Sequence, residues 1–356
     1  MGKKRVLVWG LSNNRAGTER VIRTYVQHAP NCSFDFLCYE NPANHADLFE
    51  GTDNRYFVIP VKIKHPIANR IALQRFMREH ADEYSMLWFN VNEISNIDLL
   101  KLAYDYGIPK RATHMHNPSF PDVWITKLFS QLNWKTCLRL STDYWACSKE
   151  SGAFLFKGAP FQVITNFVDG DACAFDSVKR EEVRARYDVS ESTKLIGTVG
   201  RLAPQKNQRL LIKVLPGVLE KMPNASLMLV GEGELRDELT ALASKLKVSD
   251  HVIFAGSQSD VRAYLSAFDV FAFPSVFEGL GISLLEAQFN LLPCVVSEAI
   301  PEAARISSSF KKVSLADEEG WVDALLSASR KESYLEKQSQ QYDISNIGHV
   351  VERMFK

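Results

Sequence analysis

The fold can be read from the stretch Phe273-Pro-Ser-Val-Phe-Glu-Gly-Leu-Gly-Ile-Ser-Leu-Leu-Glu286. Its first residue ends a short apolar run that begins at Val270, and an amphipathic segment begins at Ile282. The apolar run is typical of a buried strand, and the segment from Ile282 is typical of a helix. Gly279 and Gly281 allow the backbone to approach a ligand closely, and the N–H groups and dipole of a helix start favour an anion there. The stretch therefore predicts a strand–loop–helix unit with an anion site where its helix begins.

The same alternation of apolar runs and amphipathic segments continues in both directions along the chain. Near-continuous apolar runs are typical of parallel strands that helices cover on both faces. The runs lie at 5–10, 33–39, 56–61, 86–91, 111–116, 144–147 and 162–165, and then at 195–199, 226–230, 252–255, 270–273, 294–297 and 312–315. We expect an α/β protein with two Rossmann-like, doubly wound domains that face each other across a cleft.

The expected domains are an N-terminal Rossmann-like domain, a C-terminal Rossmann-like domain and a short helical segment that can pack back on the first domain. Their boundaries are 1–165, 166–335 and 336–356. The first boundary falls in a polar stretch, 166–190, in which no strong apolar period occurs.

Composition excludes several classes of protein. The chain has 356 residues, and its 42 Lys and Arg residues balance 42 Asp and Glu residues, so no positive field favours a nucleic acid as partner. The six cysteines are scattered without a C-x-x-C pair, which is typical of reduced thiols. No apolar run approaches the roughly 18 residues that a membrane span needs. We expect a cytoplasmic protein.

Two cations follow the apolar run 195–199. Arg201 offers a planar fork and Lys206 a mobile point charge, a pair that can neutralise two phosphates without a metal. Because strand ends meet at one edge of a parallel sheet, we expect both cations near the start of the helix at Ile282. Glu278 lies just before that helix start and Glu286 lies within the helix. Both carboxylates can accept hydrogen bonds from hydroxyl groups of a ligand. The alternative for the two cations is that they are solvated loop residues. The alternatives for the carboxylates are that Glu278 only complements the helix dipole and that Glu286 is a solvated or paired helix residue.

Several motifs follow one another at a familiar spacing. They are Gly200-Arg201, Lys206-Asn207, Gly231-Glu-Gly-Glu234, Phe254-Ala-Gly256, Pro274-Ser275 and Glu278-x7-Glu286. Together they resemble the retaining glycosyltransferases of family four, strongly over about 170–320. That resemblance implies the GT-B arrangement of two Rossmann-like domains, with an N-terminal acceptor-binding domain and a C-terminal donor-binding domain. Within that family the chain is most similar to bacterial enzymes of capsule and exopolysaccharide biosynthesis, a similarity that includes His114-Met-His116-Asn117.

The resemblance implies a reaction. A hexose would move from a nucleotide-diphosphate sugar, a UDP-sugar rather than a GDP-sugar, to a hydroxyl group of a lipid-linked or polysaccharide acceptor. The anomeric configuration would be retained, and no metal or other cofactor would take part. One Asp-x-Asp sequence, Asp169-Gly-Asp171, could hold a metal, but we discount it because it overlaps the domain junction.

The resemblance also implies roles for individual residues. Arg201 and Lys206 would hold the donor diphosphate and stabilise the departing nucleotide, Glu286 would hold the ribose and Glu278 would orient the sugar. The backbone around Gly279, Leu280, Gly281 and Ile282 would hold the distal phosphate, and Gly256, Ser257 and Gln258 would lie near the base. Asn166 marks the junction turn, although Thr165 and Phe167 depart from the pattern of that turn. Gly17 would lie beneath the phosphates, although Ala16 stands where the family usually has a second glycine.

His116 ends the expected strand 111–116. It matches the family's strand-end histidine and would contact the donor sugar and the reacting centre. His114 lies two residues earlier and therefore on the same face of the strand. The alternative for both histidines is a packed polar residue.

Residues 123–140 combine tryptophans and leucines with Lys127, Lys135 and Arg139. We favour a helix that buries its apolar stripe within the domain. The alternative is peripheral contact with the inner face of the cell membrane, near a lipid-linked acceptor.

Four other functions stay open at this point. A glycoside hydrolase could use Glu278 and Glu286 as acid and base, and would need no nucleotide. A dinucleotide oxidoreductase would share the sheets, but the chain lacks G-x-G-x-x-G after its first strand. A non-catalytic GT-B subunit could assist a partner transferase, and an enzyme that modifies nucleotide sugars could share the fold.

Overall fold

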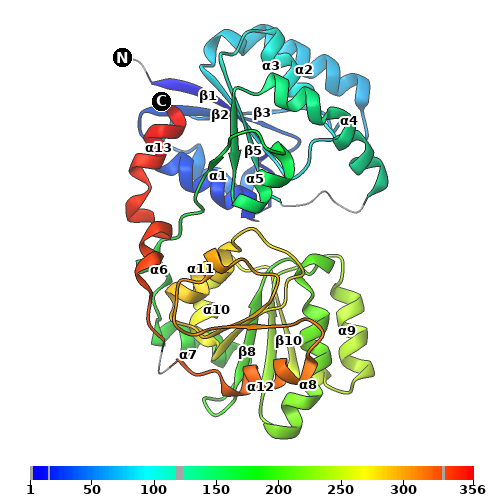
Figure 1. The fold of residues 1–356 in the computed structure, drawn as a ribbon, viewed down its shortest axis with the longest axis vertical. Coiled ribbons are helices and arrows are strands. Elements are labelled where there is room, and N and C mark those ends of the chain that lie inside the picture. The colour runs from blue at the N-terminus through cyan, green and yellow to red at the C-terminus, as the bar shows by residue number, and fades with distance from the viewer. Residues whose placement is uncertain (1–2, 15–16, 118–122, 331–332) are drawn as a thin grey trace. The chain divides into compact units, whose positions relative to one another are not determined.

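A computed structural model describes residues 3–14, 17–117, 123–330 and 333–356. The chain divides into two compact units (Figure 1). Unit 1 contains Met1–Phe167 together with Asn346–Lys356, and unit 2 contains Val168–Ser345. Each unit holds one parallel sheet covered by helices, which is the α/β class that the sequence predicts.

Unit 1 is built on a parallel sheet with the strand order β3-β2-β1-β4-β5-β6-β7. The strands are β1 (Lys4–Trp9), β2 (Cys32–Cys38), β3 (Arg55–Val58), β4 (Met86–Val91), β5 (Lys110–Met115), β6 (Asp143–Ala146) and β7 (Gln162–Val163). The helices are α1 (Gly17–Gln27), α2 (Pro66–His80), α3 (Asp98–Asp105), α4 (Trp124–Leu140), α5 (Lys149–Phe156) and α13 (Gly348–Phe355). Helices α2, α3 and α4 cover one face of the sheet, and α1 and α13 cover the other (Figure 1).

Unit 2 repeats this plan with the strand order β10-β9-β8-β11-β12-β13. The strands are β8 (Leu195–Val199), β9 (Ser226–Val230), β10 (Val252–Gly256), β11 (Val270–Phe273), β12 (Cys294–Ser297) and β13 (Phe310–Val313). The helices are α6 (Gly170–Cys173), α7 (Ser177–Arg186), α8 (Gln208–Lys221), α9 (Arg236–Lys245), α10 (Val261–Ala267), α11 (Ile282–Phe289) and α12 (Glu318–Ser327).

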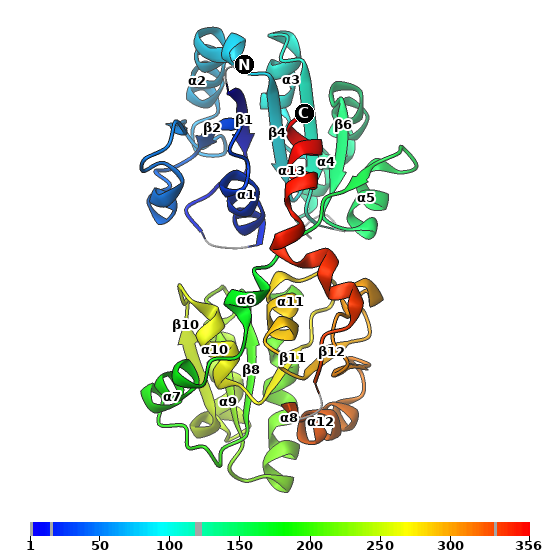
Figure 2. The ribbon, with the colours of Figure 1, turned by 90° about the vertical axis from the view of Figure 1, so that its left-hand side faces the viewer.

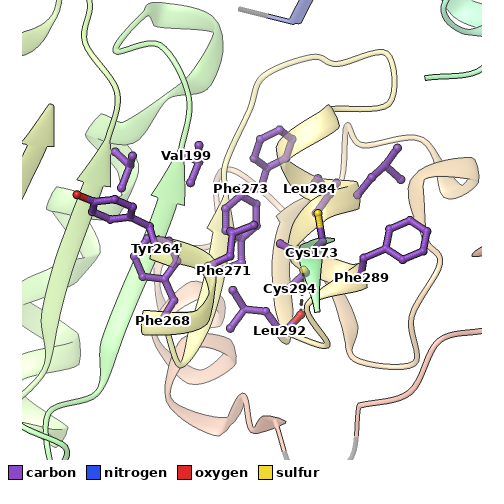
Figure 3. Packing of buried hydrophobic residues seen from close by; sticks show 14 of the residues in the cluster. Cys173, Val199, Tyr264, Phe268, Phe271, Phe273, Leu284, Phe289, Leu292 and Cys294 are labelled. Atoms are coloured by element: carbon purple, nitrogen blue, oxygen red, sulfur yellow. Dashed lines mark hydrogen bonds between the residues drawn. The ribbon is translucent and has the colours of Figure 1, made fainter. Parts of the chain in front are cut away.

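The strands of unit 2 are apolar because both faces of the sheet are buried. On one face Phe271 and Phe273 pack with Val199 and Leu284, as Figure 3 shows. On the other face Val270 and Ala272 pack against residues of α8, α9 and α12. Alternate residues of one strand thus enter two different cores, so that both must be apolar.

In each sheet the strand order reverses once, between β1 and β4 in unit 1 and between β8 and β11 in unit 2. In sheets of this kind ligands bind outside the carboxyl ends of the strands, at the point where the strand order reverses. This topology places the loop 200–207 next to the loop 274–281.

The segment 166–190, expected to be a polar boundary, contains α6 and α7. Helix α7 carries few apolar residues, and it is anchored by two arginines instead. Arg180 Nη1 donates to the carbonyl oxygen of Ala267 at 3.0 Å, and Arg184 Nη1 donates to the same oxygen at 2.7 Å. A search for apolar period misses such a helix, because its anchors are charged.

Residues 346–356 join unit 1 although they follow unit 2 in the sequence (Figure 2). The Phe355 ring lies 5.3 Å from the ring of Phe34 and 5.5 Å from that of Trp88. Lys110 Nζ donates to the carbonyl oxygen of Met354 at 2.8 Å. These contacts attach α13 to the sheet of unit 1.

None of the helices in the described ranges is both long enough and apolar enough to cross a membrane.

Candidate functional site

Hydrogen bonds join the loops that follow β8 and β11 at the reversal point of unit 2. Val276 N donates to the carbonyl oxygen of Gln205 at 2.8 Å, and Gln205 Nε2 donates to that of Phe277 at 3.1 Å. Asn207 Nδ2 adds a contact to the carbonyl oxygen of Pro274 at 3.3 Å. The two loops therefore form one rigid edge, and they carry Lys206 and Glu278 into contact.

Lys206 and Glu278 form an ion pair between Nζ and Oε1 at this edge. Their side chains are 21% and 10% exposed, so the pair is largely shielded from water. The Lys206 ammonium also lies 5.1 Å from the centre of the Phe273 ring. A cation is thus fixed beside the residues that lead into α11.

Arg201 is placed differently. Its side chain is 72% exposed, and its Nη2 lies 3.0 Å from Oε2 of Glu234, in the loop after β9. An ion pair this exposed contributes little free energy, about 0–1 kcal/mol. The guanidinium is therefore held loosely and can exchange Glu234 for another anion.

Helix α11 begins at a glycine. Gly281 caps the helix with φ +69°, a backbone conformation that favours glycine, and its carbonyl oxygen accepts from Leu284 N at 2.9 Å. The first N–H groups of a helix lack partners inside it, which makes this end suited to an anion. Leu280 and Gly279 are buried, and Ile282 packs against the core, so their backbone is fixed.

Glu286 lies in the second turn of α11 and is only 1% exposed. The alternative of a solvated helix residue is therefore wrong. Among the charges that act on Arg262, in α10, is the carboxylate of Glu286, which helps to raise the pKa of that guanidinium after the larger effect of its hydrogen bond to Asp260. Glu286 is thus a carboxylate inside unit 2 rather than on its surface.

Glycines allow the loop after β9 to lie against the loop after β8. A Cβ atom on Gly231 would lie 2.1 Å from the carbonyl oxygen of Gly200, and one on Gly233 would lie 2.3 Å from that of Leu202. Both contacts are too short for any other residue. In the sequence, Gly231 and Gly233 served only as part of the motif spacing that resembles the family, and their packing role was missed. Two loops that leave neighbouring strands at the same sheet edge approach closely, and this would have suggested that role.

The loop after β10 carries Gly256, Ser257 and Gln258. The carbonyl oxygen of Gly256 accepts from Gly231 N at 2.8 Å, and Gln258 Nε2 donates to the carbonyl oxygen of Ala255. The structure thus places these residues at the same sheet edge as the loops above, with β9 between them and β8.

At the corresponding edge of unit 1, His116 follows directly after β5. Its Nε2 lies 3.0 Å from Oδ1 of Asn90, and its ring centre lies 4.2 Å from that of His114. Burial lowers the pKa of His116 to about 3, so the ring is neutral near pH 7. The sequence interpretation missed Asn90, which is 81 residues from its other partner, Trp9.

His114 is fully buried, and burial holds its pKa well below the ordinary value. Its Nδ1 accepts from the indole Nε1 of Trp88 at 3.3 Å. No described residue bonds its Nε2. His114 is thus enclosed between β4 and the ring of His116, as the packed alternative expects.

The remaining predicted positions are Gly17, Asn166 and Asp169. Gly17 begins α1 and is exposed, whereas Ala16 lies outside the described residues. Asn166 is buried, and its Oδ1 has no hydrogen-bond partner within the described ranges. Asp169 caps α6 by accepting from Ala172 N at 2.9 Å. The described part of the chain contains no group of three or more His, Cys, Asp or Glu residues that could hold a metal.

Helix α4 does not bury its apolar stripe, so the interpretation that we favoured is wrong for its first half. Trp124 is 74% exposed and Leu132 is 66% exposed. The inward face is instead polar: Ser130 Oγ donates to Glu93 Oε2 at 3.1 Å, and Asn133 Nδ2 donates to the carbonyl oxygen of Ser95 at 2.9 Å. Hydrogen bonds to the loop after β4 hold this half, which leaves the apolar side chains outside.

Comparisons with known proteins show which proteins this chain is similar to. The model of the family "Glycosyl transferases group 1" matches residues 179–346. EpsF of Bacillus subtilis (strain 168), to which a glycosyltransferase activity is ascribed, is 28% identical over 320 residues, 84% of this chain and 80% of EpsF. The lipopolysaccharide core biosynthesis glycosyltransferase LpsE of Rhizobium meliloti (strain 1021) is 34% identical over 167 residues, 46% of each chain. The chain thus spans less than half the length of LpsE.

Among solved structures, Anabaena Alr3699/HepE in complex with UDP and glucose matches with a TM-score of 0.78 and 19% identity over 98% of both chains. At this identity the likeness is one of fold. It confirms the predicted fold class, two Rossmann-like domains that each hold a parallel sheet covered by helices.

Proposed function

This chain is a group 1 glycosyltransferase with the GT-B fold, and we propose that it moves a hexose from a UDP-sugar to a hydroxyl group, with retention and without a metal ion. The acceptor is a lipid-linked or polysaccharide intermediate of a bacterial surface glycan. UDP in the HepE structure and the lipopolysaccharide role in the name of LpsE support these choices.

One observation carries the proposal: a shielded ammonium, that of Lys206, is fixed next to the loop that caps α11. Both groups attract the same anion, because the helix start offers N–H groups and the ammonium offers charge. A diphosphate at this edge would replace Glu278 as the partner of Lys206. Glu278 would then be free to accept a hydrogen bond from the sugar.

The exposed pair of Arg201 and Glu234 supports a second exchange. Arg201 would leave Glu234 and bind the diphosphate with its planar fork. Glu286 would hold the ribose, and Gly256, Ser257 and Gln258 would lie near the base. The backbone of Gly279 to Ile282 would bind the distal phosphate. Gly17 and Asn166 would make further contacts with the donor, and His116 would contact the sugar.

The reaction then needs stabilised charge more than a protein nucleophile. The bond between the anomeric carbon and the phosphate oxygen breaks, and negative charge grows on the leaving phosphate. Lys206 beside the start of α11, and Arg201 once it has left Glu234, would stabilise that charge. The acceptor oxygen attacks the same face of the sugar and gives its proton to the departing phosphate, which accounts for retention.

Thermal unfolding with a panel of nucleotides tests the donor class. We expect UDP and UDP-sugars to raise the Tm more than GDP, ADP or NAD, because a ligand of the native state stabilises it by about 2.7 kcal/mol at one hundred times its Kd. Lys206→Ala should abolish the shift. Lys213→Ala is the matched control, since Lys213 is an exposed lysine of the same unit that lies 3.9 Å from Glu318.

The alternatives give different results in that experiment. Stabilisation by NAD alone would indicate an oxidoreductase, and the absence of any nucleotide effect would leave the hydrolase. A non-catalytic subunit would bind UDP-sugar but release no UDP from it. Slow release of UDP by the purified chain therefore separates the enzyme from the binding subunit.

The outer face of α4 supports peripheral contact with a membrane as part of this function. Its exposed apolar residues fall on one stripe, namely Trp124, Ile125, Leu128, Phe129 and Leu132. Helix α4 contains no Asp or Glu, whereas Lys127, Lys135 and Arg139 are exposed on it. A helix with tryptophan on its apolar side, cations and no anions is suited to an anionic lipid surface, where a lipid-linked acceptor would lie.

Co-sedimentation with lipid vesicles tests this contact. We expect the wild type to bind phosphatidylglycerol vesicles, and to bind vesicles of pure phosphatidylcholine more weakly. Leu132→Glu should lower the binding to phosphatidylglycerol vesicles at least tenfold. Val178→Glu is the control, because Val178 is an equally exposed apolar residue on α7 of unit 2. Equal binding by both variants would contradict the contact.

A further inference from the structure

Asn90 connects the edge of unit 1 with His116. It lies in β4, is 2% exposed and reaches three other groups with its side-chain amide. A Cβ atom on Gly10, at φ +107°, would lie 2.8 Å from the Cβ of Asn90, so only glycine allows the backbone after β1 to pass so close. The backbone after β1 therefore lies directly against Asn90.

The hydrogen bonds of Asn90 fix which end of its amide faces His116. Its Nδ2 donates to the carbonyl oxygen of Trp9 at 3.1 Å and to that of Trp88 at 3.4 Å. The reverse orientation would place Oδ1 against two carbonyl oxygens, none of which carries a proton. Oδ1 must therefore be the atom that lies 3.0 Å from Nε2 of His116.

This orientation determines the tautomer of His116. An amide oxygen can only accept, so Nε2 of His116 must carry a proton. The neutral ring has one proton, and therefore Nδ1 has a bare lone pair. No described residue donates to Nδ1, and the backbone of His116 is held independently, because its N donates to the carbonyl oxygen of Val91 at 3.0 Å.

We propose that Asn90 is a positioning residue that keeps the proton of His116 on Nε2, so that Nδ1 accepts a hydrogen bond from a hydroxyl group of the donor sugar. The inference rests on the proposed function, in which His116 contacts that sugar. It gives His116 the role of a neutral acceptor, and it excludes the ring as a general acid. Low pKa values of both histidines, caused by burial, agree with a neutral ring.

The other groups that face His116 do not compete for its ring. The thiol of Cys147, which follows β6, donates to the backbone oxygen of His116 at 2.9 Å. The His114 ring lies against it from the same strand, and its Nδ1 already accepts from Trp88. Among these described neighbours, only Asn90 bonds a ring nitrogen of His116.

Nitrogen NMR of the full chain labelled with ¹⁵N-histidine tests the tautomer without any substrate. The His116 signal is identified by its loss in His116→Asn. We expect a proton on Nε2, a bare Nδ1 and no titration between pH 5 and 8. A proton on Nδ1, or a ring that titrates near pH 6.5, would overturn the inference.

Two substitutions of His116 test which nitrogen the sugar needs. In His116→Asn the side-chain amide lies near the former Nδ1 and can still accept, whereas in His116→Gln it lies near the former Nε2. We expect His116→Asn to keep at least ten times more of the wild-type kcat/KM for the donor than His116→Gln. The opposite order would assign the sugar contact to Nε2 and contradict the proposal.

Asn90→Asp tests the positioning role through the pH profile. A carboxylate in place of the amide would still accept from Nε2, but it would stabilise the imidazolium and raise the pKa of His116. Below that pKa Nδ1 carries a proton and cannot accept, so kcat/KM should be low, and it should recover as the pH rises through the new pKa. The kcat/KM of the wild type should show no such step between pH 5 and 8.

A profile of Asn90→Asp that runs parallel to the wild type would overturn the positioning role. Should Asn90→Asp fail to fold, Asn90→Ser replaces it, with a mixed tautomer in the NMR spectrum as the expected result. A wild-type chain that turns over no nucleotide sugar contradicts the proposed function. An active wild type with the proton on Nδ1 contradicts this inference alone.

Discussion

Lys206 and Arg201 leave the same strand and meet different partners. Lys206 is shielded and held against Glu278, whereas Arg201 is exposed and held only by Glu234. Removing Lys206 would leave a carboxylate largely desolvated at the sheet edge, which is costly. Removing Arg201 leaves only an exposed carboxylate. Arg201 is therefore the cleaner probe of catalysis, because its loss hardly affects folding.

We expect Arg201→Ala to lower kcat/KM by about 10²–10³-fold, because one cation placed at a developing anion is worth a few kcal/mol. The Tm should change little, since the ion pair of Arg201 is exposed. Arg209→Ala is the matched control: Arg209 has a similar exposed pair with Glu238 at 3.1 Å on the neighbouring helix. Near-normal transfer by folded Arg201→Ala would contradict the assigned role.

At this scale the sequence predicted residue types better than pairings. The glycine cap of α11, the cations after β8 and the two carboxylates followed from motif spacing and strand ends. The pairing of Arg201 with Glu234 did not, and neither did that of Asn90 with His116. Each of these contacts joins two loops or strands that only the folded sheet brings together, so no local pattern indicates it.

At the scale of elements, α11 shows how a loop and a helix share one residue. Gly281 ends the loop at positive φ, caps the helix and lies against Phe273 of β11, whose ring carbon would be 3.0 Å from a Cβ atom. Phe273 in turn packs in the core beneath the loop (Figure 3). The position of the helix start thus depends on the core of unit 2.

Gly281→Ala should lower the free energy of unfolding by about 1–2 kcal/mol, through backbone strain and the contact with Phe273, and should weaken UDP binding. Gly51→Ala is the control, since Gly51 has the same φ of +69° and a Cβ atom added there would meet no atom within 4 Å. We expect Gly51→Ala to show the strain but unchanged UDP affinity, measured by calorimetry. Equal affinity in both variants would contradict the role of this helix start.

Elements with strong apolar runs could be predicted closely from the sequence. The expected runs at 195–199, 226–230, 270–273 and 294–297 coincide with β8, β9, β11 and β12. Helices α5, α6 and α7 were missed, and the last strand begins at Phe310 rather than Lys312. Charged anchors account for the failure at α7, and hydrogen-bonded polar residues account for the exposed stripe of α4, because apolar period reports only one way of fixing a helix.

At the scale of the whole molecule, the chain contributes to unit 1 twice. Residues 346–356 return to it after unit 2 is complete, and α13 places Phe355 against Phe34 and Trp88. The sequence predicts a helical end segment that can pack back on the first domain, but it does not indicate the apolar surface of β2 and β4 that accepts Phe355. That surface exists only in the folded unit.

Phe355→Ala should lower the free energy of unfolding of unit 1 by roughly 3 kcal/mol, the usual effect of removing a buried aromatic ring. Urea unfolding followed by tryptophan fluorescence measures this change, because five of the six tryptophans, among them the buried Trp88, lie in unit 1. Glu352→Ala, an exposed substitution on the same helix, is the control and should shift the midpoint little. Equal midpoints for both variants would show that α13 contributes nothing to the unit.

The return of α13 also sets an order of events on the ribosome. The sheet of unit 1 is synthesised first, yet the Phe355 ring that covers Phe34 and Trp88 emerges only after the whole of unit 2. Until then the nascent chain presents an uncovered aromatic surface to solvent, where chaperones bind and aggregates begin. Translation that stops after unit 2 should therefore yield a product whose earlier half is the less soluble one.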